Sequence, residues 1–124
     1  MADQSTPPRF KAGSNIALKL PARDFERTKT FYRDVLGLPL VQEERNSLAF
    51  EFGSLRLWLD RMEGLDRAQV WLEVRTDDTE AAAEFLAGQG VERRDEVEEL
   101  PPGFDGFWIS DPAGIIYLVS GEED

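Results

Sequence analysis

One order of secondary structure occurs twice along this chain of 124 residues. In each half, an alternating strand is followed by a helix and then by three short strands. Internal repetition of such a unit strongly constrains the fold. We therefore expect an α+β fold with two βαβββ modules, over residues 13–62 and 68–121, in one compact domain. One offset relates the halves, pairing Leu18 with Leu72, Asp24 with Asp78 and Phe31 with Phe85.

The first repeat begins with a strand over residues 15–20, in which apolar and polar residues alternate. A helix follows over residues 24–37, because its apolar residues recur at helical spacing. Asp24 is the expected N-cap of this helix, and Gly37 is the expected stop. The three strands that complete the module are expected over residues 38–42, 47–52 and 54–60.

The second repeat begins with an alternating strand over residues 69–74 and continues with an alanine-rich helix over residues 78–90. This helix is expected to begin at Asp77 or Asp78 and to end at Gly88 or Gly90. Three more strands are expected within residues 91–99, 104–110 and 114–120, separated by the turns LPPG and DPAG.

Net charge and hydropathy limit the partners and the location. The formal net charge is −11, from 25 acidic and 14 basic residues. This balance disfavours binding to nucleic-acid phosphates. No apolar run is long enough to span a membrane. The segment over residues 1–12 lacks the apolar core of a signal peptide and is expected to be a mobile lead-in. We expect a cytoplasmic protein.

The chain contains no histidine and no cysteine. Histidine is the usual general base near neutral pH and a common metal ligand, and cysteine supplies thiolate nucleophiles and disulfides. Their absence disfavours zinc and copper sites, Ser-His and Cys-His catalysis, and a disulfide framework. A magnesium or calcium site built only from oxygen ligands remains open.

Three segments of the chain resemble the vicinal oxygen chelate superfamily, the fold of glyoxalases, dioxygenases and bleomycin-resistance proteins. They are two helix entries, LPARDFERTKTFYRDVLGL and LEVRTDDTEAAAEFLAGQGV, and a turn with its strand, SDPAGIIYLV. The resemblance covers nearly the whole chain after residue 12. It implies that each module forms a curved mixed sheet, that the paired sheets enclose a cavity, and that the protein is a homodimer.

Enzymes of this superfamily hold a divalent metal with His and Glu side chains at fixed strand positions. The resemblance places these positions at Ala17, Gln69 and Tyr117. Hard cations need several oxygen ligands with some negative charge, which these three side chains do not offer. The resemblance therefore implies the fold without a metal or other cofactor. It favours the branch that binds and sequesters drugs such as bleomycin.

In this fold the sheet face opposite the helix-packed core lines the cavity. By strand parity, that face carries two tryptophans among polar side chains. Aromatic surfaces suit a flat ligand, and carboxylates suit a cationic group. The predicted ligand-binding residues are Lys19, Arg56, Trp58, Asp60, Gln69, Trp71, Glu73, Trp108 and Tyr117.

Several of these residues have a simpler interpretation. Trp58 and Trp71 also suit plain packing between sheets or across a dimer contact. Trp108 either closes the cavity or packs in the core. Tyr117 faces the cavity only if a one-residue deletion lies in the turn before it; otherwise Leu118 does. In addition, Arg56 with Asp60 or Glu73 suits a solvated ion pair, and Lys19 suits a surface position.

The favoured function is binding of a flat small molecule, in its most specific form a cationic antibiotic. One alternative is a metal-independent lyase or isomerase with Glu73 or Asp60 as base and Tyr117 or Arg56 as electrophile. Another is a degenerate metal site built from Glu73, Asp60 and Gln69. The last is a module with a closed cavity that serves only in assembly.

Overall fold

The computed structural model describes residues 7–122, which contain two α-helices and nine β-strands. The chain divides into two compact units, residues 14–71 (the first unit) and residues 7–13 with 72–122 (the second unit). Their boundary falls within strand β6 (Gln69–Thr76). Within the described residues, no helix is long and apolar enough to cross a membrane.

The first unit has four strands of its own, at the places where alternation predicted them. The strand order is β3-β4-β5-β2, and residues 69–71 of β6 pair with β2. Strands β2 and β5 run parallel, whereas the other neighbours run antiparallel, so the sheet is mixed. The bounds are β2 (Asn15–Pro21), β3 (Leu40–Glu43), β4 (Ser47–Phe52) and β5 (Leu55–Met62).

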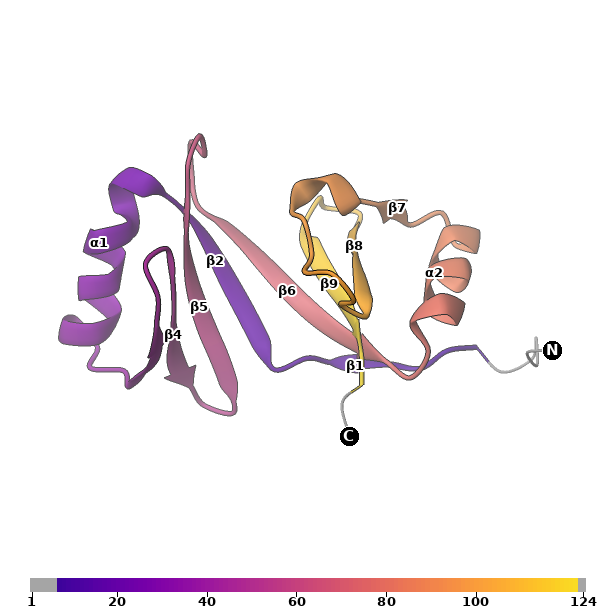
Figure 1. Ribbon diagram of the computed structural model, residues 1–124, viewed down its shortest axis with the longest axis horizontal. Coiled ribbons are helices and arrows are strands. Elements are labelled where there is room, and N and C mark those ends of the chain that lie inside the picture. The colour runs from indigo at the N-terminus through magenta and orange to yellow at the C-terminus, as the bar shows by residue number, and fades with distance from the viewer. Residues whose placement is uncertain (1–6, 123–124) are drawn as a thin grey trace. The chain divides into compact units, whose positions relative to one another are not determined.

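Helix α1 (Ala22–Thr30) lies beside this sheet and covers one of its faces (Figure 1). The core between them contains Leu20, Phe25, Phe50, Leu57 and Leu59, each at most 4% exposed. Full burial of an apolar side chain of this size stabilises the folded state by about 1.5–3 kcal/mol relative to leaving it exposed. Leu57 and Leu59 of β5 therefore point into this core, and Trp58 between them points to the opposite face.

The start of α1 differs from the prediction. The N-cap is Pro21, with φ −54° and ψ 142°, and no side chain caps the helix. Strand β2 runs directly into the helix, and proline suits this junction because its nitrogen has no hydrogen to leave unpaired. Asp24 lies in the first helical turn and pairs with Arg27. There its carboxylate faces the positive end of the helix dipole.

The end of the first helix is as predicted. After α1 the chain makes a π-helical turn over Phe31–Val35, and the Leu36 amide bonds the Phe31 carbonyl at 3.0 Å. Gly37 then adopts a φ of +72°, a left-handed conformation that glycine tolerates best. The predicted stop at Gly37 is confirmed.

The second unit contains residues 72–76 of β6 and four further strands. The strand order is β6-β9-β8-β7, and β1 pairs antiparallel with β6. Strands β6 and β9 run parallel, so this sheet is also mixed. The bounds are β1 (Phe10–Ala12), β7 (Glu92–Arg93), β8 (Gly106–Ser110) and β9 (Ile116–Gly121).

Strand β1 falls within the stretch expected to be a lead-in, and residues 1–6 of that stretch lie outside the described part of the chain. Helix α2 (Thr79–Gly88) packs on the second sheet over a core of Ala82, Phe107 and Val119. Its N-cap is Asp78, whose carboxylate accepts a hydrogen bond from the Ala81 amide at 3.0 Å. This contact decides between the two aspartates that the sequence left open.

The strand expected over residues 91–99 is wrong in its extent. Within this stretch only Glu92 and Arg93, which form β7, pair with β8, and a short 3₁₀ helix follows over Asp95–Val97. The cause is visible in one contact, since the Asp95 carboxylate accepts the Trp108 amide hydrogen at 3.0 Å. A side chain thus takes a donor on β8 that a longer strand would have paired.

Candidate functional site

The polar and aromatic face of the first sheet consists of rows of side chains from paired residues on neighbouring strands. Each such row, called a rung here, crosses β2. On one rung Lys19 lies between Asp60 of β5 and Gln69 of β6. On the next, Ala17 lies between Trp58 and Trp71. Paired residues share a face of the sheet. The register therefore brings these predicted residues together on the face opposite the core.

The Lys19 rung is a closed polar network. The Lys19 Nζ lies 2.8 Å from Asp60 Oδ2, and the Ser47 hydroxyl donates to Asp60 Oδ1 at 2.5 Å. Lys19 is only 4% exposed, so the expected surface position is wrong for this residue. Burial is tolerated because the ammonium has a carboxylate partner. Both carboxylate oxygens of Asp60 are thus engaged within the protein.

Trp71 is buried on the same face and touches this network. The Lys19 Nζ lies 4.3 Å from the centre of the Trp71 ring, within the range of a cation–π interaction. The indole N–H of Trp71 donates to Gln69 Oε1 at 3.0 Å. One face of the Trp71 ring therefore already has a cationic neighbour.

Trp58 is half-buried and lies between two small residues, Ala49 of β4 and Ala17 of β2. Its indole N–H donates to Asn15 Oδ1 at 2.8 Å, which fixes the orientation of the ring. The residues paired with Trp58 on both sides are thus alanines, whose side chains are small. Trp58 therefore has the geometry of a platform for a flat molecule.

A polar pocket of about 440 Å³ adjoins the rung that precedes Trp58. Glu51, Arg56 and Asn15 share that rung and all line the pocket. Together they offer three kinds of polar group to a ligand. The carboxylate accepts hydrogen bonds, the guanidinium donates them, and the amide can do both. Arg56, one of the predicted residues, thus lies at a pocket next to the tryptophan platform.

Sequence reasoning did not select Ser47, Ala49 and Glu51, which complete the three rungs. The signal was nonetheless present, because these residues alternate with Leu48, Phe50 and Phe52 along β4.

Glu73 lies in the second unit and is engaged there. Its Oε2 accepts a hydrogen bond from the Ser120 hydroxyl at 3.4 Å, and its Oε1 lies 3.8 Å from Arg75. Its backbone carbonyl accepts the Gly13 amide hydrogen at 2.9 Å. A cationic ligand would have to compete with Arg75 for this carboxylate.

The other two predicted residues of the second unit lie on opposite faces of its sheet. Trp108 pairs with Leu118, which pairs with Glu73, so these three share one face. Trp108 is buried, and its indole N–H donates to the Glu98 carbonyl at 2.9 Å. Tyr117 pairs with Leu72, on the helix-packed side.

Tyr117 therefore does not join the face that carries Glu73, and Leu118 does. The turn before β9 sets this parity, because Asp111 Oδ1 accepts the amide hydrogens of both Ala113 and Ile115 at 2.9 Å. The closed turn makes Ile116 the first paired residue of β9. Glu73 and Tyr117 accordingly do not form an acid–base pair.

The positions of the superfamily's metal ligands do not fit a divalent metal here. Ala17 has no donor atom, the Gln69 oxygen accepts from Trp71, and Tyr117 points to the helix side of its sheet. Among residues 7–122, no group of three acidic, histidine or cysteine side chains could hold a metal ion.

Comparison with solved structures shows what the fold is similar to. The Mn(II)-bound glyoxalase of Novosphingobium aromaticivorans superposes with a TM-score of 0.67 at 23% identity, over 92% of this chain and 40% of that one. Homoprotocatechuate 2,3-dioxygenase of Arthrobacter globiformis superposes with a TM-score of 0.64 at 26% identity, over 97% of this chain and 39% of that one. A hypothetical protein of Bacillus halodurans C-125 superposes with a TM-score of 0.67 at 12% identity, over 93% of this chain and 96% of that one.

This chain thus spans about two fifths of the length of the glyoxalase and of the dioxygenase. No curated protein matches the sequence significantly. The sequence profile of the glyoxalase-like domain matches residues 15–119, which is most of the chain. The chain therefore belongs to the glyoxalase-like domain family, within the vicinal oxygen chelate superfamily.

Proposed function

We propose that this protein binds a flat small molecule on the face of the first sheet that carries Lys19, Trp58 and Trp71. The observation that carries the proposal is the position of Trp58, a half-buried indole between two alanines, beside a polar pocket. Ligand sites typically combine an aromatic surface with a few placed polar groups.

Trp58 suits stacking better than Trp71 does. Trp71 is 6% exposed and has Lys19 over its ring. A ligand on that face of Trp71 would have to displace a buried, paired ammonium group, which is costly. We therefore assign the stacking surface to Trp58, with hydrogen bonds from Arg56 and Asn15.

The most specific form of this proposal is sequestration of a flat, cationic antibiotic of the bleomycin kind. The net charge of −11 favours the approach of a cation. Asp60 and Glu73 are both engaged with internal partners. Stacking on Trp58 is then expected to supply most of the affinity, and charge mainly the association rate.

We also propose that the protein acts as a homodimer. Three large apolar side chains are exposed along the end of the first helix: Phe31 at 45%, Leu36 at 51% and Val35 at 69%. Burial of such side chains against a second copy would remove apolar surface from water. Sedimentation equilibrium of the wild type and of Val35→Lys tests this; a monomer at all concentrations would contradict it.

The binding experiment is a calorimetric titration with metal-free bleomycin, at low and at physiological salt. We expect micromolar or tighter binding to the wild type. Trp58→Leu should weaken it by about tenfold, whereas Trp58→Phe should retain most of it because a flat ring remains. Arg56→Gln tests the polar contact beside it.

Two results would count against the proposal. Absence of heat at saturating drug would remove the bleomycin form, and a panel of flat aromatic metabolites would then test stacking itself. Equal affinities for the wild type and Trp58→Leu, with any ligand of the panel, would overturn the assignment of Trp58.

A further inference from the structure

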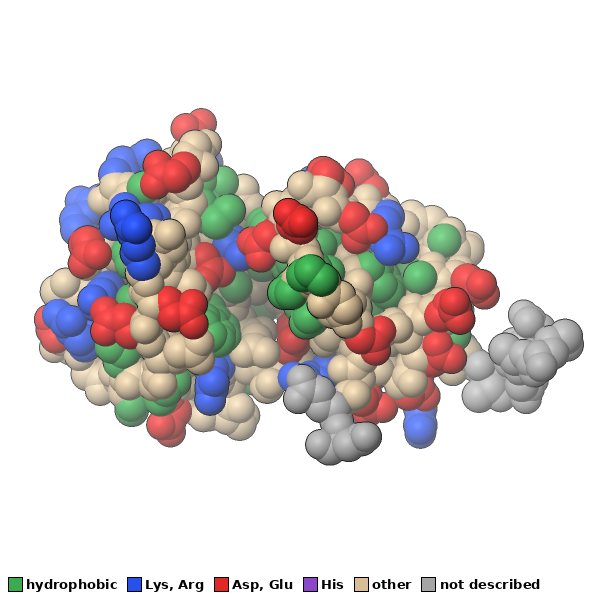
Figure 2. Space-filling model, viewed as in Figure 1, with side chains coloured by type: hydrophobic (Ala, Val, Ile, Leu, Met, Phe, Trp, Pro, Cys, Tyr) green, Lys and Arg blue, Asp and Glu red, His purple; other side chains and the backbone are tan. Residues whose placement is uncertain are grey.

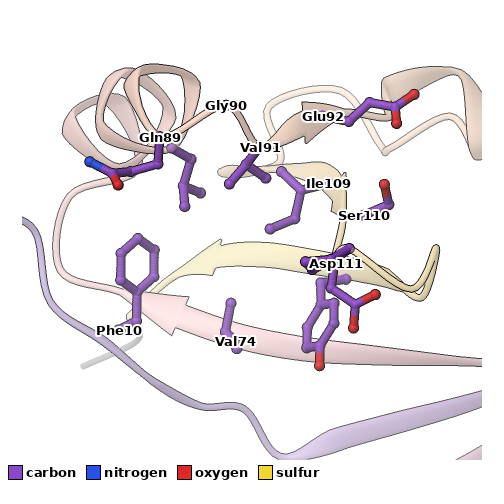
Figure 3. Close-up of a pocket in the computed structure, with 12 residues that line it drawn as sticks. Phe10, Val74, Gln89, Gly90, Val91, Glu92, Ile109, Ser110 and Asp111 are labelled. Atoms are coloured by element: carbon purple, nitrogen blue, oxygen red, sulfur yellow. The ribbon is translucent and has the colours of Figure 1, made fainter.

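The second unit contains a pocket of about 540 Å³ on the helix-packed side of its sheet. Its lining is mostly apolar and includes Phe10, Val74, Leu86, Val91 and Ile109 with the ring of Tyr117. Figure 3 shows Phe10 of β1, Val74 of β6, Ile109 of β8 and Val91 of the loop before β7 converging on its centre. A volume of this size is typical of a site for a small molecule.

The repeat explains why this space exists. At the common offset, Phe25 and Tyr32 of the first module correspond to Thr79 and Leu86 of the second. Phe25 is 2% exposed, and the Tyr32 ring lies 5.9 Å from Phe50, so both aromatic side chains fill the first core. Of these two, Leu86 lines the pocket, and its side chain is smaller than the Tyr32 ring at the same place in the first module. Phe10 closes one end of the space by packing on Phe85, with ring centres 6.3 Å apart.

Charge is distributed very unevenly between the two units. Residues 14–71 contain nine Lys and Arg against nine Asp and Glu, whereas the rest of the chain contains five against sixteen. The whole net charge of −11 therefore comes from the part of the sequence outside residues 14–71, which includes the unit that holds the pocket. Figure 2 shows the same contrast, with mixed red and blue over the first unit and mainly red over the second.

Two acidic residues line the pocket, Glu92 on β7 and Asp111 in the turn before β9. Figure 3 shows their carboxylates pointing outward, away from the apolar side chains. The arginines next to Glu92 bind other partners, since Arg93 pairs with Asp95 at 2.7 Å and Arg94 with Glu96 at 2.6 Å. Asp111 uses Oδ1 to close its turn. Negative charge thus stands at the rim of an apolar space.

We infer that this pocket binds a small molecule with an apolar body and a single cationic head, such as an alkylammonium compound. The apolar body would lie among Phe10, Leu86 and Ile109, and the head would lie near Glu92 and Asp111. Burial of the ligand's alkyl chain supplies affinity, and the acidic residues at the rim favour a positively charged head over a neutral or negative one. This site is independent of the rung face of the first unit, so the two proposals can fail separately.

The test uses three probes of equal chain length, octyltrimethylammonium, n-octanol and octanoate, each below its micelle concentration. Affinities for the full chain are measured by calorimetry at physiological salt. We expect octyltrimethylammonium to bind more tightly than octanol, and octanoate to bind most weakly. Equal or reversed affinities would overturn the cationic class of ligand.

Variants separate the apolar body from the charged rim. Val91→Phe fills the pocket and should reduce binding of both octyltrimethylammonium and octanol by at least about tenfold. Glu92→Gln with Asp111→Asn should weaken only the cation, by about threefold per carboxylate. The Asn retains an acceptor oxygen for the turn.

The matched control is Glu84→Gln with Glu99→Gln, which removes the same charge from exposed positions of the same unit outside the pocket. This control should leave every affinity unchanged at physiological salt. Circular dichroism checks that each variant is folded. If folded Val91→Phe binds the probes as the wild type does, the pocket is not the site and the inference is wrong.

Discussion

Lys19 and Asp60 face each other across parallel strands β2 and β5, with the Nζ and Oδ2 atoms 2.8 Å apart. The two side chains are 5% and 18% exposed, so the pair is largely shielded from water. Ser47 satisfies the second carboxylate oxygen of Asp60, and the Trp71 ring lies against the ammonium. The pair therefore holds three strands and one tryptophan in a fixed arrangement.

We predict that Lys19→Met destabilises the protein strongly. It leaves a shielded carboxylate without its cation, and loss of one partner of such a pair typically costs about 3–5 kcal/mol. Replacing both residues, as in Lys19→Met with Asp60→Leu, should recover much of this loss because no charge is left unpaired. Urea unfolding of the three proteins measures the differences.

The control is Lys11→Met. Lys11 pairs with Glu122 at 2.7 Å, but the two side chains are 64% and 38% exposed. Loss of an exposed pair is expected to cost less than about 1 kcal/mol. If the two lysine variants lose the same stability, the shielded pair contributes no more than a surface one.

Alternation and the internal repeat were sufficient to predict most elements and the two faces of the central strands. They could not predict the partner of Asp60. Whether Asp60 pairs with Lys19 or with Arg56 depends on the register between strands, and register follows from long-range packing. The parallel pairing of β2 with β5 decides it.

The errors have local causes of a similar kind. Asp24 was predicted as a cap from its residue type, but the strand continues to Pro21 and the helix begins there. The inward position of Tyr117 depended on one residue of turn length, which the hydrogen bonds of Asp111 determine. The pocket beside Tyr117 was not foreseen, because it depends on how side chains from β1, β6, α2 and β8 pack together.

We predict that Gly13→Ala destabilises the second unit. A Cβ at Gly13 would collide with the Glu73 side chain, which is 10% exposed and bound to Ser120 and Arg75. Forced movement of a packed side chain costs about 1–3 kcal/mol. The double variant Gly13→Ala with Glu73→Ala should recover part of this loss in a mutant cycle.

Gly88→Ala is the comparison for this substitution. A Cβ there meets no atom within 4 Å, and the residue is helical. Alanine in a helix is more favourable than glycine, so this variant should be neutral or slightly stabilising. Equal losses for the two variants would show that contact with Glu73 is not the cause.

We predict that Asp95→Ala weakens the protection of the Trp108 amide. The Asp95 carboxylate is the acceptor for this amide hydrogen, and Trp108 is buried. A buried amide donor that is left without its acceptor costs about 1–3 kcal/mol. Asp95→Asn keeps an acceptor oxygen and loses only the exposed pair with Arg93, so it is the control. Hydrogen exchange of this amide should accelerate in the alanine variant alone.

The last prediction concerns how the contact between Asp77 and Arg9, the residue before β1, makes the stability of the protein depend on pH. The Arg9 amide donates to Asp77 at 3.0 Å, and the guanidinium of Arg9 lies 3.5 Å from the same carboxylate. These contacts hold the pKa of Asp77 below its ordinary value. A carboxyl group whose pKa is lowered by folding stabilises the folded state above its unfolded pKa of about 3.9.

That contribution is lost as the pH falls through the folded pKa of Asp77. Asp77→Asn should therefore be less stable than the wild type at pH 7, and the difference should disappear at pH values below that folded pKa. Thermal unfolding of both proteins across this range measures it, and the carboxyl carbon of Asp77 reports the pKa by NMR. Since the Arg9 side chain is 87% exposed, added salt should reduce the difference at pH 7. A difference between the two proteins that stays constant with pH would show that the negative charge of Asp77 is not what stabilises this contact.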